Sequence, residues 1–184
     1  MYIGHIYLDD SMSGTAESLI GLIDALDRQG VRQHVLVRHK LLARRLAVYN
    51  SVVVGPRVKV PVMACCLMPN VQVVHIHCDA GASAGLLLTL TRSIPYVLTC
   101  RSEFVSTNHP IKHSIFNRAA GLIFPDQGIA ARNAIANHRV PVNVVADSHY
   151  ATATDAHVNN RIAAEHLRIY RRAIDSGRIP ALML

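Results

Sequence analysis

The alternation of short apolar runs with helical periodicity most constrains what this chain can fold into. Residues 2–8 form an apolar run, and a polar turn follows at residues 9–13. From residue 15 onward, apolar side chains recur at the spacing of one helix face: Ala16, Leu19, Ile20, Ile23 and Leu26. A second apolar run covers residues 34–37. A strand, a helix and a strand in this order predict a βαβ unit with parallel strands.

The same alternation continues along the chain. Further helices are expected over residues 41–49, 82–91, 113–120 and 128–137, and further strands over residues 51–54, 71–76, 96–99, 122–124 and 142–145. The strand segments are continuously apolar, which is typical of a sheet covered on both faces. The sequence therefore predicts an α/β fold with one doubly wound, mainly parallel, Rossmann-like sheet.

The segment after residue 145 differs from the rest. A polar stretch leads into one long helix, expected from about residue 155 to residue 175, with an apolar face and four arginines on the other side: Arg161, Arg168, Arg171 and Arg172. Because no strand follows, this helix is expected to pack back onto the sheet. We expect a Rossmann-like domain over residues 1–146, with residues 147–184 as a linker and helix of the same globular unit.

Composition narrows the class of protein. A chain of 184 residues with 51% hydrophobic residues matches one globular domain, and a two-domain enzyme is not expected. The longest apolar run has seven residues, whereas a membrane-spanning helix needs about 20. The four cysteines form no Cys-x-x-Cys pair, and the first residues lack the pattern of a secretion signal. A cytoplasmic protein is therefore expected.

The formal net charge of +7 permits an acidic partner. Tryptophan is absent and aromatic residues make up 5% of the chain, which argues against a base-stacking surface for nucleic acid. The basic segment at residues 39–46 contains Lys40, Arg44 and Arg45 beside leucines. It suits peripheral contact with an anionic membrane surface, such as the inner membrane, or it is a core-facing helix with solvated arginines.

Ligands of open doubly wound sheets bind at the carboxyl ends of the strands. The loop after the first strand leads into a helix whose N-cap is expected at Gly14, with Glu17 at the third helical position. Amides at such a helix start favour a phosphate, although an ordinary helix cap explains the same residues. The Gly-x-Gly-x-x-Gly and P-loop patterns are both missing here.

Two further strand ends carry polar residues. His75 and His77 are expected on one face of their strand, with His77 and Asp79 at the mouth of the sheet. The two histidines supply only two ligands for zinc, and no second cluster of ligands is evident in the sequence, so we expect no metal site. A neutral His77 that hydrogen-bonds a ligand hydroxyl is favoured instead.

After the next strand, Arg101 is placed to bind a phosphate or carboxylate through two hydrogen bonds. Glu103 is placed to orient a sugar hydroxyl or to accept a proton. An Arg101–Glu103 ion pair that stabilises the loop is an equally good interpretation. Cys100 is expected to be a small buried residue rather than a nucleophile.

Taken together, these segments resemble the N-terminal domain of retaining GT-B glycosyltransferases of the GT4 type. The resemblance rests on the order and spacing of Gly-Thr-Ala-Glu at residues 14–17, a helix ending in Ala-Leu-x-x-x-Gly at residue 30, and the segments at residues 73–79, 94–99, 119–124, 140–145 and 161–173. The last segment is similar to the C-terminal helix that crosses back onto the N-terminal domain in that family.

The resemblance also shows departures from the family. A second Rossmann-like domain, which binds most of the nucleotide sugar, stands in that family before the crossing helix, whereas only residues 146–155 stand there in this chain. Arg101 aligns with a histidine of the family, and Thr15 aligns with its second glycine. The chain is therefore expected to be an acceptor-side half that does not transfer sugar alone and needs a donor-domain partner chain or a homo-oligomer.

The resemblance implies a role in polysaccharide or glycolipid assembly, with a nucleotide sugar as substrate and no cofactor. It implies a cleft lined by His77, Arg101 and Glu103 as catalytic candidates, and by four donor-binding residues: Gly14, Thr15, Glu17 and Asp79. Two alternatives remain open at this stage. One is a non-catalytic, degenerate transferase that acts as a scaffold or oligomerising module, and the other is a nucleotide-binding Rossmann protein with unrelated chemistry.

Overall fold

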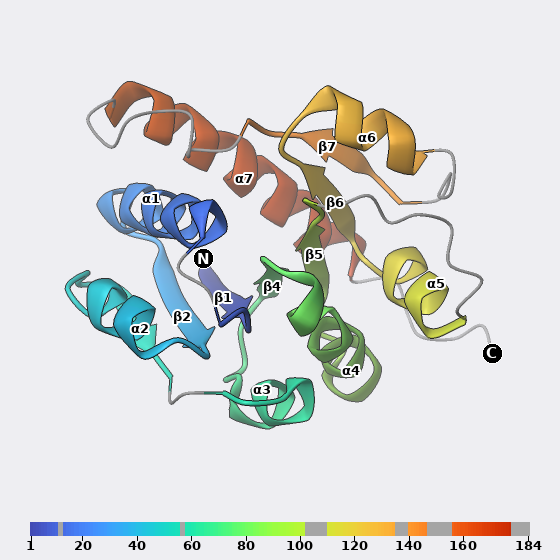
Figure 1. Cartoon of the computed structure of the whole chain (residues 1–184), viewed down its shortest axis with the longest axis horizontal. Helices are drawn as coiled ribbons and strands as arrows, with labels where there is room; N and C mark the ends of the chain where they lie inside the picture. Colours follow the sequence, from blue (N-terminus) through green and yellow to red (C-terminus); the bar gives the residue numbers. More distant parts are fainter. Residues whose placement is uncertain (11–12, 56–57, 102–109, 135–139, 147–155, 178–184) are drawn as a thin grey trace.

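The computed structural model describes residues 1–10, 13–55, 58–101, 110–134, 140–146 and 156–177. Strands and helices alternate along the chain, as Figure 1 shows. The strands are β1 (Tyr2–Tyr7), β2 (Arg32–Val37), β3 (Val52–Val54), β4 (Val73–Ile76), β5 (Tyr96–Thr99), β6 (Gly121–Phe124) and β7 (Val142–Val144). The helices are α1 (Gly14–Arg28), α2 (Lys40–Leu46), α3 (Pro61–Leu67), the short 3-10 helix η1 (Asp79–Gly81), α4 (Ala82–Arg92), α5 (Pro110–Asn117), α6 (Gln127–Ala134) and α7 (Ala156–Ser176).

The sheet has the order β3-β2-β1-β4-β5-β6-β7, and every neighbouring pair is parallel. The order runs outward in both directions from β1 and β4, so the predicted doubly wound α/β class is confirmed. Strands β1, β4, β5 and β6 are buried almost throughout, because helices cover both faces of the sheet.

The register of β1 decides which side chains share a face. Ile3 pairs with Val73, and His5 pairs with His75, so these four side chains lie on the same face of the sheet. Helices α1 and α7 cover that face and pack against one another, as Figure 1 shows. Residues of opposite parity, such as Ile6 and Ile76, face the other side, where α3, α4 and α5 pack.

The long helix α7 packs onto the sheet as the sequence predicts. Its buried side includes Ile162, Ala163, Tyr170 and Ala173, which join Ile3, Val73 and Val97 of the strands in one hydrophobic cluster. Burial of this apolar surface stabilises the helix at roughly 25 cal/mol per Å². The four arginines noted in the sequence are exposed on the outer side of α7.

Helix α3 is the main element that the periodicity does not predict. Most of the apolar run of residues 62–68 folds into this helix, which begins with Pro61, ends at Leu67 and packs against α4. Seven residues give less than two helical turns, too few for a recognisable periodic pattern. The remaining predicted elements are present, with ends that differ by a few residues.

Candidate functional site

The carboxyl ends of β1, β4 and β5 meet where the strand order reverses, which is where open α/β sheets bind ligands. A small cavity of about 30 Å³ lies there, between α1, α7 and the sheet. Its polar lining comes from Ser18, His75, His77, Thr99, Arg101 and His166. A single water needs roughly 10–15 Å³ measured in this way, so the cavity has room for about two waters rather than for a nucleotide.

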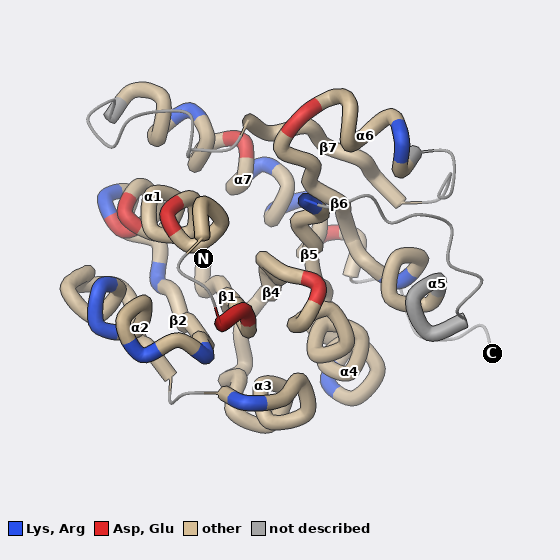
Figure 2. The backbone as a smooth tube through the Cα atoms, in the orientation of Figure 1, with Lys and Arg blue, Asp and Glu red and all other residues tan. Residues whose placement is uncertain are grey.

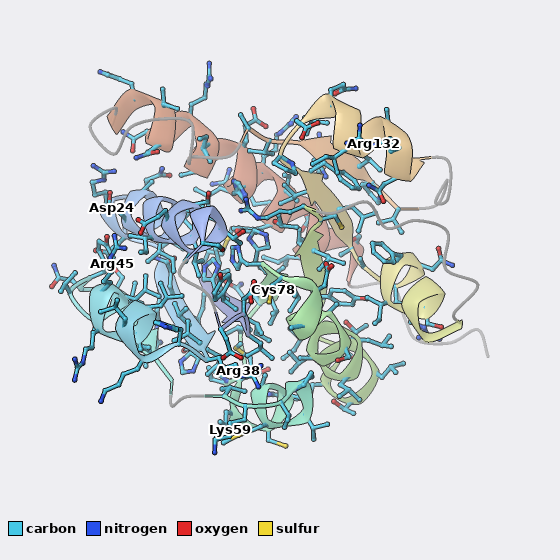
Figure 3. The ribbon with its side chains drawn as sticks, in the orientation of Figure 1. Asp24, Arg38, Arg45, Lys59, Cys78 and Arg132 are labelled. Atoms are coloured by element: carbon cyan, nitrogen blue, oxygen red, sulfur yellow. The ribbon has the colours of Figure 1, made fainter. Side chains whose placement is uncertain are left out.

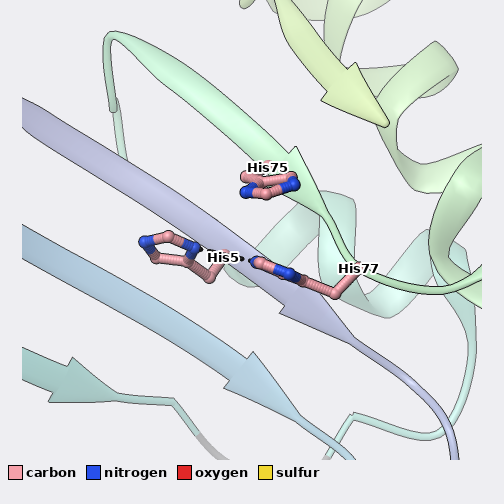
Figure 4. A group of neighbouring side chains, drawn as sticks. All are labelled: His5, His75 and His77. Atoms are coloured by element: carbon pink, nitrogen blue, oxygen red, sulfur yellow. Dashed lines mark hydrogen bonds between the residues drawn. The ribbon is translucent and has the colours of Figure 1, made fainter. Parts of the chain in front are cut away.

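Three histidines gather beside this cavity, as Figure 4 shows. His5 comes from β1, His75 from β4, and His77 follows β4 directly; all three are at most 2% exposed. The distance from His5 Nδ1 to His77 Nε2 is 3.0 Å, which is a hydrogen bond. The ring centroids of His75 and His77 are 3.8 Å apart. The predicted placement of His75 and His77 on one face is confirmed.

His75 connects three elements. Its Nδ1 lies 2.6 Å from the hydroxyl oxygen of Tyr170 on α7, and its Nε2 lies 2.6 Å from Oγ1 of Thr99 on β5. Both ring nitrogens therefore have a hydroxyl partner, and these bonds offset the desolvation of a buried imidazole. We conclude that His75 holds α7 against the carboxyl ends of β4 and β5.

Burial keeps the histidines of this site neutral. It lowers the pKa of His5 to about 3 and that of His166, on α7, to about 4. Burial also lowers the pKa of His75 and of His77 well below the ordinary value, and neighbouring histidines and Arg101 lower both further. At neutral pH each ring therefore carries one proton and one lone pair.

Arg101 supplies the positive charge of the site. Burial lowers the pKa of its guanidinium to about 10, while Tyr7 acts in the opposite direction, so Arg101 remains charged at neutral pH. The hydroxyl of Tyr7 lies 3.3 Å from Oγ of Ser13, directly before α1. The carboxyl end of β1, the start of α1 and Arg101 are thereby close together. This arrangement can bind an anion through a guanidinium and helix-start amides.

The three histidines also raise the question of a metal, since their possible ligand atoms lie within 4.8 Å of one another. Zinc places its ligand nitrogens about 2.0–2.1 Å from a shared centre. Here His5 and His77 hydrogen-bond each other, and both nitrogens of His75 already bond hydroxyls. In addition, the positive charge of Arg101 acts on His75 and His77, and it would repel a cation bound to them. The cluster fits a hydrogen-bonded network better than a divalent cation, and the absence of a metal site stays a prediction.

The structure separates the residues that the sequence proposes for the cleft. His77 and Arg101 both line the cavity. Gly14 and Thr15 form the first residues of α1, with Ser13 rather than Gly14 as the N-cap. Asp79 lies in η1, two residues beyond His77. Glu103, and with it the Arg101–Glu103 pair, lies outside the described residues.

Glu17 has a different partner from the one that the resemblance implies. Its carboxylate forms two hydrogen bonds with Arg45 of α2, one of them 2.9 Å long, on the exposed side of α1. With Ser13 as the N-cap, Glu17 also stands one position later in the helix than expected. It does not belong to the residues that line the cavity, so its described contacts join α1 to α2.

The basic segment of α2 is a core-facing helix on its inner side. Leu42 and Leu46 are buried against β2, while Leu41 is half exposed. Lys40, Arg44 and Arg45 are exposed, and Figure 2 shows the basic residues along α2. Figure 3 labels Arg45 between α1 and α2, where it pairs with Glu17. Contact of Lys40, Arg44 and Arg45 with an anionic membrane stays a prediction. Within the described part of the chain, no helix combines the length and the hydropathy that a membrane span requires.

Sequence reasoning did not find several residues of the site, among them His5, His166 and Tyr170. His5 lies inside an apolar strand, where periodicity alone treats it as one more core position. His166 and Tyr170 are four residues apart on the buried side of α7, so the sequence pattern does not distinguish them from the apolar residues of that side. The one available signal was that a polar residue on a buried face needs a partner.

A larger cavity of about 390 Å³ lies away from this cluster. Its lining includes Pro95, Arg118, Ala119 and Gly177, which stand at the amino ends of β5 and β6 and at the end of α7. Ligands of doubly wound sheets bind at the opposite ends of the strands. The small polar cavity is therefore the better candidate for a functional site.

No protein-family model matches the sequence, and a comparison with curated protein sequences finds no match. Among solved structures, the fold is similar to HepE of Anabaena in complex with UDP-glucose, with a TM-score of 0.62 and 16% identity over 80% of this chain. The same protein with UDP and glucose gives a TM-score of 0.60 at 17% identity, and with UDP 0.56 at 14%. The matched region covers 44% of the HepE chain, and the likeness at this identity shows the fold.

Proposed function

We propose that this chain is the acceptor-side half of a GT-B-type glycosyltransferase that acts on a nucleotide sugar. The observation that carries the proposal is the position of Arg101 and His77 together at the reversal of strand order. A guanidinium binds phosphate oxygens through paired hydrogen bonds, and a neutral imidazole binds a hydroxyl. The similarity of the fold to a protein solved with UDP-glucose supports the same ligand class.

The dimensions of the cavity support the second part of the proposal, namely that this chain provides half of the site. Ligand pockets have volumes of roughly 300–1,000 Å³, whereas the polar cavity has about 30 Å³. A nucleotide sugar would therefore lie across the mouth of the cavity and need further walls. A donor-binding domain, in another chain or in a longer form of this one, would supply them. Sugar transfer by the chain alone is not expected.

The binding experiment compares UDP-glucose, UDP, and the corresponding GDP and ADP forms by calorimetric titration of the purified chain. Saturable binding of a nucleotide sugar is expected, in the millimolar range or tighter. Replacing Arg101 by Gln removes the charge but keeps a polar side chain, so affinity should fall about tenfold or more. Arg172→Gln on the exposed side of α7 is the matched control and should leave affinity unchanged.

Two outcomes contradict the proposal. Absence of binding for all three nucleotide classes, together with a stable homodimer in a size measurement, supports the alternative of a non-catalytic scaffold. Equal loss of affinity in Arg101→Gln and Arg172→Gln shows that net charge, rather than the cavity, attracts the ligand. A link to polysaccharide or glycolipid assembly would then lose its support as well.

A further inference from the structure

A buried chain of side chains reaches from the inside of the sheet to the cavity. Gln33 of β2, His5 of β1 and His77 after β4 come from three neighbouring positions in the strand order. All three are fully or almost fully buried. Figure 4 shows His5 and His77 joined by the 3.0 Å hydrogen bond between His5 Nδ1 and His77 Nε2. The direction of this bond decides what His77 offers to a ligand.

Gln33 sets the direction at the inner end of the chain. Its amide nitrogen donates to the carbonyl oxygen of Ile23 at 3.1 Å, which leaves Oε1 as an acceptor. Gln33 Oε1 and His5 Nε2 are both buried, and neither has a hydrogen-bond partner among the described residues. In the register of β1 and β2, Gln33 lies opposite Ile3 and His5 lies opposite Val35, so Gln33 and His5 are diagonal neighbours on the same face of the sheet. A pairing of these two atoms gives each the partner that it lacks, and it requires the proton of His5 on Nε2, because an amide oxygen can only accept.

The remaining bond directions follow from proton counting. A neutral imidazole has one N–H, so His5 with its proton on Nε2 accepts at Nδ1. His77 Nε2 must then donate across the 3.0 Å distance, because two lone pairs facing each other would repel. His77 consequently carries its proton on Nε2 and a lone pair on Nδ1. No hydrogen bond to this Nδ1 is formed by the described side chains, and His77 lines the cavity.

We propose that Gln33 and His5 are positioning residues that fix the tautomer of His77, so that its Nδ1 accepts a hydrogen bond from a hydroxyl of the bound ligand. The ligand part of this inference rests on the proposed function and assigns His77 to a sugar or acceptor hydroxyl. A phosphate oxygen accepts hydrogen bonds and cannot donate to Nδ1, whereas Arg101 donates to phosphate oxygens. The cavity therefore divides hydroxyl and phosphate recognition between two side chains.

The first test measures tautomers without any ligand. Long-range ¹H–¹⁵N spectra of the histidine-labelled chain at neutral pH should show Nε2–H tautomers for both His5 and His77. Gln33→Met keeps the length of the side chain but lacks the acceptor oxygen, and it should produce a mixture of tautomers at both histidines. Gln72→Met is the control, because Gln72 accepts a hydrogen bond from the Tyr2 amide away from the histidines.

An Nδ1–H tautomer at His77 in the unmodified chain overturns the proposal, whether or not the Gln33→Met variant folds. Unchanged tautomers in a folded Gln33→Met variant overturn the role of Gln33. These readings are independent of any nucleotide, so they remain decisive if the proposed function fails.

The second test assigns the hydroxyl. Gln33→Met should lower the affinity for UDP-glucose by about three- to tenfold, the loss of one hydrogen bond, and leave the affinity for UDP unchanged. Equal losses for UDP-glucose and UDP overturn the hydroxyl assignment, because the nucleotide part would then depend on Gln33 as well. No binding of either nucleotide overturns the proposed function and the hydroxyl assignment together, while the tautomer spectra still decide the positioning roles.

Discussion

The two faces of the sheet contain different chemistry. The face under α1 and α7, called here the polar face, buries His5, His75, His77, Thr99 and His166 next to its apolar residues. The face under α3, α4 and α5, called here the apolar face, is built around one large hydrophobic cluster. Both faces belong to the same strands, so the difference arises from the parity of residues along each strand.

Close packing distinguishes the apolar face. A Cβ added at Gly85 of α4 would lie 2.7 Å from the ring of Tyr96, so this helix approaches β5 more closely than any side chain allows. The hydroxyl of Tyr96 bonds the carbonyl oxygen of Ile115. On the polar face, by contrast, hydrogen-bonded side chains replace apolar contacts where the cavity opens. The comparison suggests that the apolar face supplies stability and that the polar face holds groups for a ligand.

Acid should affect the polar face most strongly. His5 and His166 have pKa values of about 3 and about 4 in the folded chain and an ordinary value of 6.5 when unfolded. Between these values the unfolded chain binds more protons, so the free energy of unfolding falls as the pH falls. These two residues together should remove about 3 kcal/mol between pH 6.5 and pH 5, and His75 and His77 act in the same direction. Urea unfolding across this pH range measures the slope.

The control for this prediction removes one titrating group. His166→Met keeps a side chain of similar length without a proton site, and the slope should decrease by up to about 1.4 kcal/mol per pH unit. Unfolding free energies that do not change between pH 6.5 and pH 5 would contradict the neutral, buried state of the polar face. On the apolar face, His34 of β2 acts in the same direction, because burial lowers its pKa as well.

A cavity in the apolar face should lower stability without changing recognition. Phe124, at the end of β6, is 1% exposed and belongs to the apolar cluster. Phe124→Ala should lower the free energy of unfolding by about 3 kcal/mol, because it removes buried contacts and leaves a void. Urea unfolding at low temperature measures this loss, and nucleotide titration of the folded variant should give the affinity of the unmodified chain. A large change in affinity would show that the two faces are not separate in function.

Much of this comparison was available from the sequence. Continuous apolar strands and helical periodicity predict the α/β class, the parallel sheet and the packed-back α7, since these features follow from burial and spacing. The polar ends of β4 and β5 likewise predict His77 and Arg101 at one edge of the sheet. Topology brings them together: β4 and β5 are neighbours in the sheet.

The rest of the site depends on long-range register. His5 and His75 are paired across two strands that are 70 residues apart in sequence, and no local pattern reports such a pairing. Tyr170 contacts His75 because of the way α7 packs on the sheet, and the two residues are 95 positions apart in the sequence. Glu17 illustrates the opposite case, since the resemblance assigns it to the donor site, whereas its carboxylate pairs with Arg45 of α2.

The coupling between His75 and Tyr170 tests whether the polar face works as a network. A double-mutant cycle with His75→Leu and Tyr170→Phe should give an interaction free energy of about 1–2 kcal/mol, because each single change leaves a buried polar group without its partner. The reference cycle combines His75→Leu with Phe124→Ala on the other face, and these two changes should add within about 0.5 kcal/mol. An interaction free energy near zero for His75 and Tyr170 would show that the 2.6 Å contact between them does not contribute to stability. Both cycles are measured by urea unfolding.

The finest test uses two neighbouring residues of β5 that face opposite sides. Thr99→Val removes the hydroxyl that bonds His75 Nε2, and Leu98→Val removes one methylene from the apolar cluster. Each should lower the free energy of unfolding by about 1 kcal/mol, so stability alone does not distinguish them. The distinction lies in His75: Thr99→Val should change its ¹⁵N spectrum, since one ring nitrogen loses its partner, whereas Leu98→Val should leave that spectrum unchanged. Identical His75 spectra in both variants would mean that residue parity along β5 does not separate a polar face from an apolar one.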